Sequence, residues 1–142
     1  MALMDDFHFL VGETLMYCQC IENDIKLMCS ALIDGDFNAN MQEVEMQGMG
    51  YALTVLKEAD QKRKNPYFDK SDYNLLHSLR KTRNYYAHQV YVNFVYLQGE
   101  SFERGLVEEY SKLEGEHLNL SKLVRVVEKV RLQILKDSKK FK

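Results

Sequence analysis

The amino-acid sequence predicts an all-α protein, an antiparallel up-and-down bundle of four long helices and one short helix. Three observations support this class. Apolar residues recur at steps of three and four along most of the chain, which is the period of an amphipathic helix. No convincing alternation of apolar and polar residues occurs, apart from the ambiguous segment 91–96. Turn and stop residues, among them Gly35, Pro66 and Gly99, separate the helical stretches from one another.

The first predicted helix runs from Met4 to Leu32. Asp5 and Asp6 suit the positive N-terminal end of a helix, and the run that begins Asp34-Gly35 is a stop signal. One face of this helix has apolar residues at steps of three and four, with Thr14 completing the series: Met4, Phe7, Val11, Cys18, Ile21, Ile25, Met28 and Leu32.

The second predicted helix covers about residues 41 to 62, with a weaker apolar period. Gly48 and Gly50 lie inside it, and each costs a helix about 1 kcal/mol relative to Ala. Two glycines so close indicate either close helix packing or a break. The segment ending in Asn65-Pro66 is a connection, because Pro cannot continue a helix and disfavours α geometry at the residue before it.

The third predicted helix begins near residues 69–71, where Asp and Ser are good caps, and runs to about Leu97. Gly99 is expected to end it. A short helix over 102–113 follows. The last helix is expected to open at Asn119 or Ser121 and to close in a lysine-rich end, which suits a helix C-terminus.

Length and composition predict one folded domain over residues 1–142. The chain is 46% apolar and 28% charged, which excludes a disordered or low-complexity protein. No uncharged stretch approaches the ~20 residues that span a bilayer, so we expect no membrane partner. The start lacks the features of a signal peptide, which predicts a cytoplasmic protein. The three cysteines (Cys18, Cys20, Cys29) are expected to be reduced, with no metal site and no cofactor.

The net charge of −2 is unevenly distributed along the sequence. Residues 1–56 have a net charge of −8, residues 57–83 of +4 and residues 84–142 of +2. The local basic zone Lys57–Arg83 could attract a polyanion. The alternative is that this zone is simply a solvated loop.

Within the third predicted helix, an arginine occupies a position that faces the core. Arg83 lies in the middle of a face of otherwise apolar or aromatic residues: Leu76, Leu79, Tyr86, Val90, Phe94 and Leu97. Arginine keeps its proton, so this side chain must find an acidic partner, reach water or line a cavity. The first helix offers Glu13, Glu22 and Asp24 as partners.

A second, polar face of this helix consists of His77, Arg80, Lys81, Asn84, His88 and Tyr91. Asn84 and His88 are four residues apart and therefore neighbours on the helix surface. Arg83 and His88 are five apart, about 140° around the axis, so they do not share a face.

The segment Arg83-Asn84-Tyr85-Tyr86-Ala87-His88 resembles the signature of the HEPN superfamily, in which an Arg and a polar residue precede a His late in the third main helix. The preceding segment 75–82 also looks like the helix that leads into this signature. The order of the helices and the size of the domain resemble those of HEPN proteins over most of the chain. The specific signature within it is six residues long.

This resemblance implies a metal-independent endoribonuclease whose site forms between the two protomers of a homodimer. His88 would be the general acid/base that helps the RNA 2′-hydroxyl attack the adjacent phosphate, and Arg83 would hold that phosphate. Asn84 would orient the His or the phosphate. Around this catalytic set, the nucleic acid would be bound by Arg80, Lys81 and Tyr91. The implied setting is a toxin–antitoxin or phage-defence system with a nucleotidyltransferase-type antitoxin as partner.

Two departures leave alternatives open. HEPN toxins paired with such an antitoxin usually have a Tyr two residues after the His, whereas position 90 is Val and the nearest tyrosine is Tyr91. Many HEPN domains are non-catalytic, so the alternative function is a helical bundle that binds a protein or nucleotide partner. An unrelated helical adaptor is a third hypothesis. Taken singly, Arg83 could form a structural salt bridge, His88 could be an ordinary exposed histidine, and the tyrosines could pack in the core.

Overall fold

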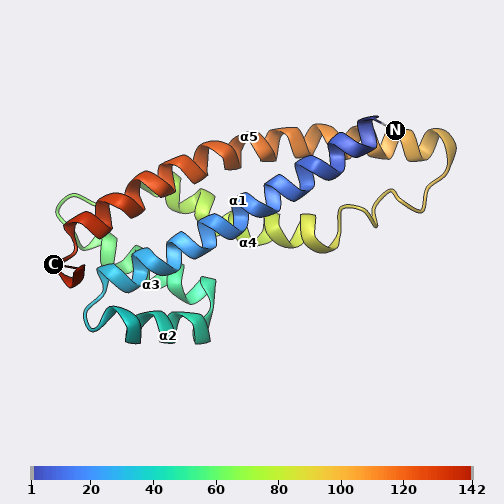
Figure 1. Ribbon diagram of the computed structural model, residues 1–142. Helices are drawn as coiled ribbons and strands as arrows, with labels where there is room; N and C mark the ends of the chain where they lie inside the picture. Colours follow the sequence, from blue (N-terminus) through green and yellow to red (C-terminus); the bar gives the residue numbers. More distant parts are fainter. Residues whose placement is uncertain (1, 142) are drawn as a thin grey trace. The chain divides into compact units, whose positions relative to one another are not determined.

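A computed structural model describes residues 2–141 and confirms the all-α class (Figure 1). Over these residues the secondary structure is entirely helical, with no strand. The five α-helices and one 3-10 helix are α1 (Ala2–Leu32), α2 (Phe37–Gln47), α3 (Met49–Gln61), α4 (Lys70–His88), α5 (Gly99–Asp137) and η1 (Lys139–Phe141).

The chain forms two compact units, which we describe separately. The first unit comprises residues 2–19 and 79–123 of the described chain, and the second unit comprises residues 20–78 and 124–141. Helices α1, α4 and α5 each contribute residues to both units. The assignment of the chain to a single domain remains a prediction.

The first predicted helix is confirmed, but the second is divided in two. Gly48 ends α2 and precedes α3, with a φ of 91° that favours glycine. Its N–H bonds to the Val44 carbonyl and so closes α2. Of the two explanations for the paired glycines, the break is therefore the right one. Helix α2 begins earlier than expected because the Asp36 side chain accepts a hydrogen bond from the Ala39 N–H, at 3.0 Å.

The third predicted helix begins where expected, at Lys70, but it ends at His88 rather than near Leu97. The N–H groups of Gln89 and Val90 both bond to the Tyr85 carbonyl, each at 2.9 Å, and irregular turns follow. The segment after His88 is rich in valine and aromatic residues, which are weak helix formers. Packing then determines the path of this segment, because Val90 and Phe94 are both buried in the core of the first unit.

The two last predicted helices are a single helix, α5, which is 39 residues long. Gly115 and Asn119 lie inside it without ending it. Their weak helix propensity is outweighed by the burial of Leu113 and Leu120 on the same helix. The described chain thus has three long helices and two short ones, of 11 and 13 residues.

The core of the first unit is aromatic and joins α1 and α5 to the segment after α4. Phe7 lies at its centre, with its ring edge-to-face against Phe94 at a centroid distance of 5.6 Å. Gly105 allows this segment to approach α5, because a Cβ at that position would lie 2.8 Å from the Phe94 Cβ. The buried members of the core are Phe7, Val11, Tyr86, Val90, Phe94, Leu106 and Leu113.

The second unit contains a fully buried carboxylate, Asp60, near the end of α3. Asp60 accepts hydrogen bonds from the N–H groups of Tyr67 and Phe68, at 2.8 and 3.1 Å. The Tyr73 hydroxyl donates a third, at 2.6 Å. This carboxylate therefore fixes the connection between α3 and α4, which contains Pro66.

Two further sequence predictions concern the membrane and the redox state of the cysteines. Over residues 2–141, no helix has an apolar stretch that is long enough to cross a membrane. No disulfide joins the three cysteines, and burial raises the pKa of the Cys29 thiol to about 11.

Candidate functional site

The residues of the predicted motif lie on the last two turns of α4, in the first unit. Helix packing orients these turns, because Leu79 and Tyr86 are buried and direct the opposite side of the helix to solvent. Three residues on that side are exposed: Arg80, Lys81 and Asn84. The prediction of one apolar and one polar face is therefore confirmed for this part of α4.

Arg83 is half-buried, between the two faces. Its guanidinium donates a hydrogen bond to the Oδ1 atom of Asn84, at 3.3 Å, so the first two residues of the motif are in direct contact. Two of the three predicted acidic partners of Arg83 are engaged elsewhere. Glu13 bonds to His117, and Asp24 pairs with Arg131 at 3.2 Å. Glu22 stays a predicted partner.

His88 is the last residue of α4, and its side chain is exposed. Its ring makes no hydrogen bond to the part of the chain that the structure describes, so both ring nitrogens are accessible to a ligand. An exposed imidazole can exchange protons with a bound substrate, and Arg83 on the preceding turn supplies a fixed positive charge.

Tyr91 is placed differently from the other predicted RNA-binding residues. It is half-buried, and its hydroxyl lies 2.7 Å from the Nδ1 atom of His8 on α1. Its ring packs edge-on against Phe7, with centroids 5.5 Å apart. Burial raises the pKa of the Tyr91 hydroxyl. Tyr91 thus belongs to the aromatic core of the first unit and brings His8 to the segment after the motif.

A hydrogen-bonded network anchors the segment that follows His88. The Tyr85 hydroxyl donates to the buried carboxylate of Glu109 on α5, at 2.6 Å. Asn93 donates to the Tyr85 oxygen at 2.9 Å and accepts from Gln89 at the same distance. Burial, together with the hydrogen bond to Glu109, raises the pKa of Tyr85 to about 12. The residues on both sides of His88 are therefore held to α5.

Beside this network lies an open cleft of about 420 Å³, formed by the turn after α4 and the first turns of α5. Its walls include the polar side chains of Asn93, Ser101, Arg104, Glu108 and Glu109, and the apolar side chains of Phe94 and Leu97. A cleft with both cationic and anionic walls suits a small polar ligand.

No group of three or more His, Cys, Asp and Glu side chains within residues 2–141 is arranged to hold a metal ion.

Comparisons of the chain with protein-family models, with curated proteins and with solved structures gave no match. The interpretation of the motif therefore depends on its own residues and their geometry.

The sequence analysis missed Glu109 and Tyr85, although a signal for Glu109 was present. Glu109 continues an apolar series on α5 at steps of three and four, between Leu106 and Leu113. A charged residue in such a series indicates a buried polar contact, by the argument applied to Arg83. His8 had no such signal, because its partner Tyr91 is 83 residues away in the sequence.

Proposed function

We propose that this protein is a HEPN-like, metal-independent endoribonuclease whose catalytic residues are Arg83 and His88. The observation that carries the proposal is the geometry of the last two turns of α4. The Arg83 side chain is hydrogen-bonded to the Asn84 side chain, and His88 is exposed at the helix end with its ring nitrogens accessible. Arg80 and Lys81 add two exposed positive charges one turn earlier.

The proposed chemistry uses the nucleophile that RNA itself contains. A histidine accepts the proton of the 2′-hydroxyl as its oxygen attacks the phosphorus, and the bond to the 5′-oxygen breaks. A second histidine protonates the departing 5′-oxygen. The products are a 2′,3′-cyclic phosphate and a 5′-hydroxyl. Arg83 stabilises the additional negative charge on the phosphate oxygens, and Asn84 fixes the orientation of Arg83.

This chemistry needs two proton-transfer groups, and the motif of one chain supplies one histidine. We therefore propose a homodimer with a HEPN-like antiparallel arrangement, in which the motifs of two copies form one cleft. Such a pair would suit a toxin–antitoxin or phage-defence system, with a nucleotidyltransferase-type antitoxin as partner. Lowering the protein concentration below that needed for the dimer should then reduce the specific activity.

The test is RNA cleavage in EDTA by the wild-type protein and by Arg83→Ala and His88→Ala. We expect each substitution to lower the rate by about 10²–10⁴-fold, the usual contribution of a general acid/base. His77→Ala is the matched control, because His77 is an exposed histidine of the same helix outside the motif. Circular dichroism should show that all variants are folded.

A second candidate is a non-catalytic bundle that binds a nucleotide or a protein partner. The cleft beside Asn93 and Arg104 favours it, because that cleft has the size and polarity for a small ligand. Binding of a nucleotide that depends on Arg104 but not on His88, without cleavage of RNA, would support this candidate over the ribonuclease.

A further inference from the structure

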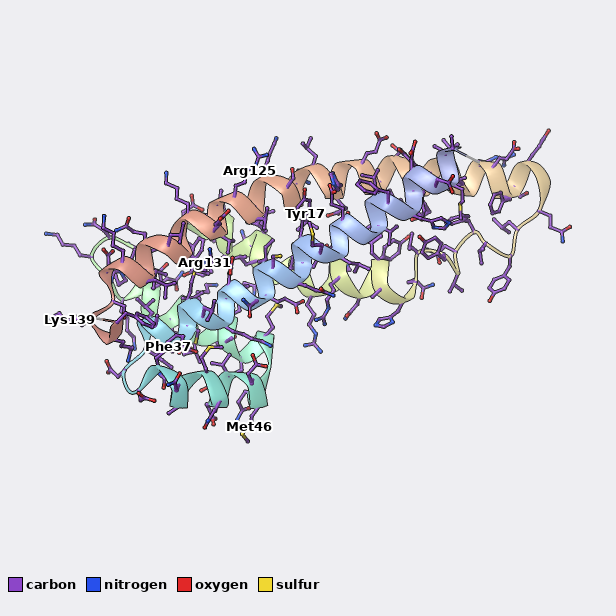
Figure 2. The ribbon with its side chains drawn as sticks, viewed as in Figure 1. Tyr17, Phe37, Met46, Arg125, Arg131 and Lys139 are labelled. Carbon is purple, nitrogen blue, oxygen red and sulfur yellow. The ribbon has the colours of Figure 1, made fainter. Side chains whose placement is uncertain are left out.

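A basic cleft of about 340 Å³ lies in the second unit and is lined by residues outside the motif. It forms where the end of α1, the segment after α3 and the end of α5 meet. Three cationic side chains line it, Arg63 from the segment after α3 and Lys139 and Lys140 from η1. Figure 2 shows Lys139 beyond the end of α5.

Two short segments concentrate positive charge at this cleft. Residues 62–64 and 136–141 together contain six lysines and arginines but only one acidic residue, Asp137. Asp34 and Asp137 also line the cleft and oppose an anion. The carboxylate of Asp137 is exposed but accepts hydrogen bonds from Tyr67 at 2.7 Å and Gln133 at 2.9 Å, and three cationic side chains outnumber the two carboxylates at the cleft.

Arg63 is held in a fixed orientation. Its guanidinium carbon lies 4.2 Å from the ring centroid of Tyr67, and Tyr67 is itself fixed by its bond to Asp137. A guanidinium stacked in this way loses little freedom when its N–H groups bind a phosphate. Lys140 donates to the Gly35 carbonyl, which fixes the opposite side of the cleft.

An exposed aromatic ring lies next to these cations. Phe141 follows Lys139 and Lys140 in η1 and is 50% exposed. Its ring forms an edge-to-face contact with Phe37, with centroids 4.9 Å apart. Cationic side chains that follow a backbone, next to an aromatic ring on which a base can stack, are typical of single-stranded nucleic-acid binding.

We propose that this cleft binds the phosphate backbone of single-stranded RNA and that Phe141 stacks on one of its bases. The choice of RNA, rather than another polyanion, rests on the proposed ribonuclease function. The cleft is a binding surface for the substrate strand, separate from the residues that cleave it.

The experiment measures binding by fluorescence anisotropy, with a labelled RNA strand of about twelve nucleotides whose 2′-hydroxyls are all methylated. Such a strand cannot be cleaved, so binding is measured apart from catalysis. We expect Arg63→Glu and the double variant Lys139→Glu/Lys140→Glu each to weaken binding about tenfold at low salt. The double variant should also reduce the salt dependence of log K by about 1.4, or 0.7 for each phosphate that the variant no longer neutralises.

Arg125→Glu is the matched control for charge. Arg125 is an exposed cation of the second unit, which Figure 2 shows pointing away from the ribbon of α5. We expect this variant to bind RNA within about twofold of the wild type, because it changes the net charge by the same amount as Arg63→Glu but lies outside the cleft. Phe141→Ala should weaken RNA binding about fivefold or more and leave the binding of inorganic polyphosphate unchanged.

Three results would overturn the proposal: no binding of the RNA strand by the wild type, equal losses for Arg125→Glu and the cleft variants, or tighter binding of phosphatidylserine vesicles or a polyglutamate peptide than of RNA. Two outcomes separate this proposal from the proposed function. If the wild type binds the strand through the cleft but cleaves no RNA, the ribonuclease proposal fails and the cleft proposal stands. If it cleaves RNA while the cleft variants bind normally, only the cleft proposal fails.

Discussion

Each unit of this protein contains a buried carboxylate that accepts a hydrogen bond from a tyrosine hydroxyl. In the second unit Asp60 accepts from Tyr73, and in the first unit Glu109 accepts from Tyr85, both at 2.6 Å. Asp60 also binds two backbone N–H groups of the connection before α4, whereas Glu109 reaches the connection after α4 only through side chains.

This difference indicates different roles for the two connections. A carboxylate bonded to backbone groups fixes one path of the chain, and the N–H groups lose their only partner if it is removed. A network of side chains holds its segment less strongly and can rearrange, since Tyr85 and Asn93 can turn to water. The connection before α4 is thus fixed by hydrogen bonds to its backbone, whereas the one after it is held by side chains, including the buried Val90 and Phe94.

The largest expected effect is that of Asp60→Ala. We expect it to lower the free energy of unfolding by about 3–5 kcal/mol, because three donors, two of them buried, lose their acceptor. Glu109→Ala is the comparison, with an expected loss of about 1–2 kcal/mol. Urea unfolding followed by circular dichroism measures both losses. Equal losses would contradict the difference between Asp60, which holds backbone groups, and Glu109, which holds only side chains.

The next prediction concerns the close approach of the connection after α4 to α5. Gly105→Ala should destabilise the protein by about 1–3 kcal/mol, because the added Cβ would overlap Phe94. Gly115→Ala, on the same helix and with open space around its Cα, should instead stabilise it by about 0.5–1 kcal/mol. Thermal unfolding of the two variants should shift in opposite directions, and shifts of the same sign would contradict this packing.

Removing single hydroxyls sharpens the contrast. Tyr85→Phe takes from Glu109 its tyrosine donor, whereas Tyr73→Phe leaves Asp60 with two backbone donors. We expect Tyr85→Phe to speed amide hydrogen exchange over residues 89–93 at a stability cost of about 1–2 kcal/mol. Tyr73→Phe should leave exchange over residues 67–68 slow. Unchanged exchange over 89–93 would show that the Tyr85 network does not hold the segment.

The smallest effect is a loss of stability at alkaline pH. Burial and a carboxylate neighbour raise the pKa of Tyr85 and of Tyr67 from 10.0 to about 12, so the folded protein keeps protons that the unfolded chain loses. The contribution of these two tyrosines to the free energy of unfolding is complete below pH 10 and disappears as the pH rises towards 12. The melting temperature should therefore fall over this range, and less steeply for Tyr85→Phe. An identical slope for the variant would contradict the assignment to Tyr85.

The helical class, the first helix and the start of α4 could be predicted because apolar periodicity and capping residues are local signals. The end of α4 could not, because residues 91–96 fit no single period and Phe94 is held by distant Phe7. The continuity of α5 was missed for a related reason. Gly115 is a weak signal for a break, and packing along the helix outweighs it.

For the candidate site, the sequence predicted the two faces of α4 and the unusual position of Arg83. It did not predict the contact between Arg83 and Asn84, since neighbouring residues on a helix point in different directions. Glu109 interrupts an apolar series at helical spacing, as Arg83 does, whereas Asp60 follows Leu56, the last apolar residue of its series. A charged residue among apolar residues at helical spacing therefore indicates a buried polar contact, and this signal is more general than the Arg83–His88 motif.

The central claim is that Arg83 and His88 cleave RNA without a metal ion. The most direct measurement is the rate of RNA cleavage in EDTA by wild-type protein, Arg83→Ala, His88→Ala and His77→Ala, with analysis of the product ends. The account predicts 2′,3′-cyclic phosphate ends from the wild type and His77→Ala, and losses of about 10²-fold or more for the two motif variants. Equal rates for all four folded proteins, or no cleavage by any, would contradict it.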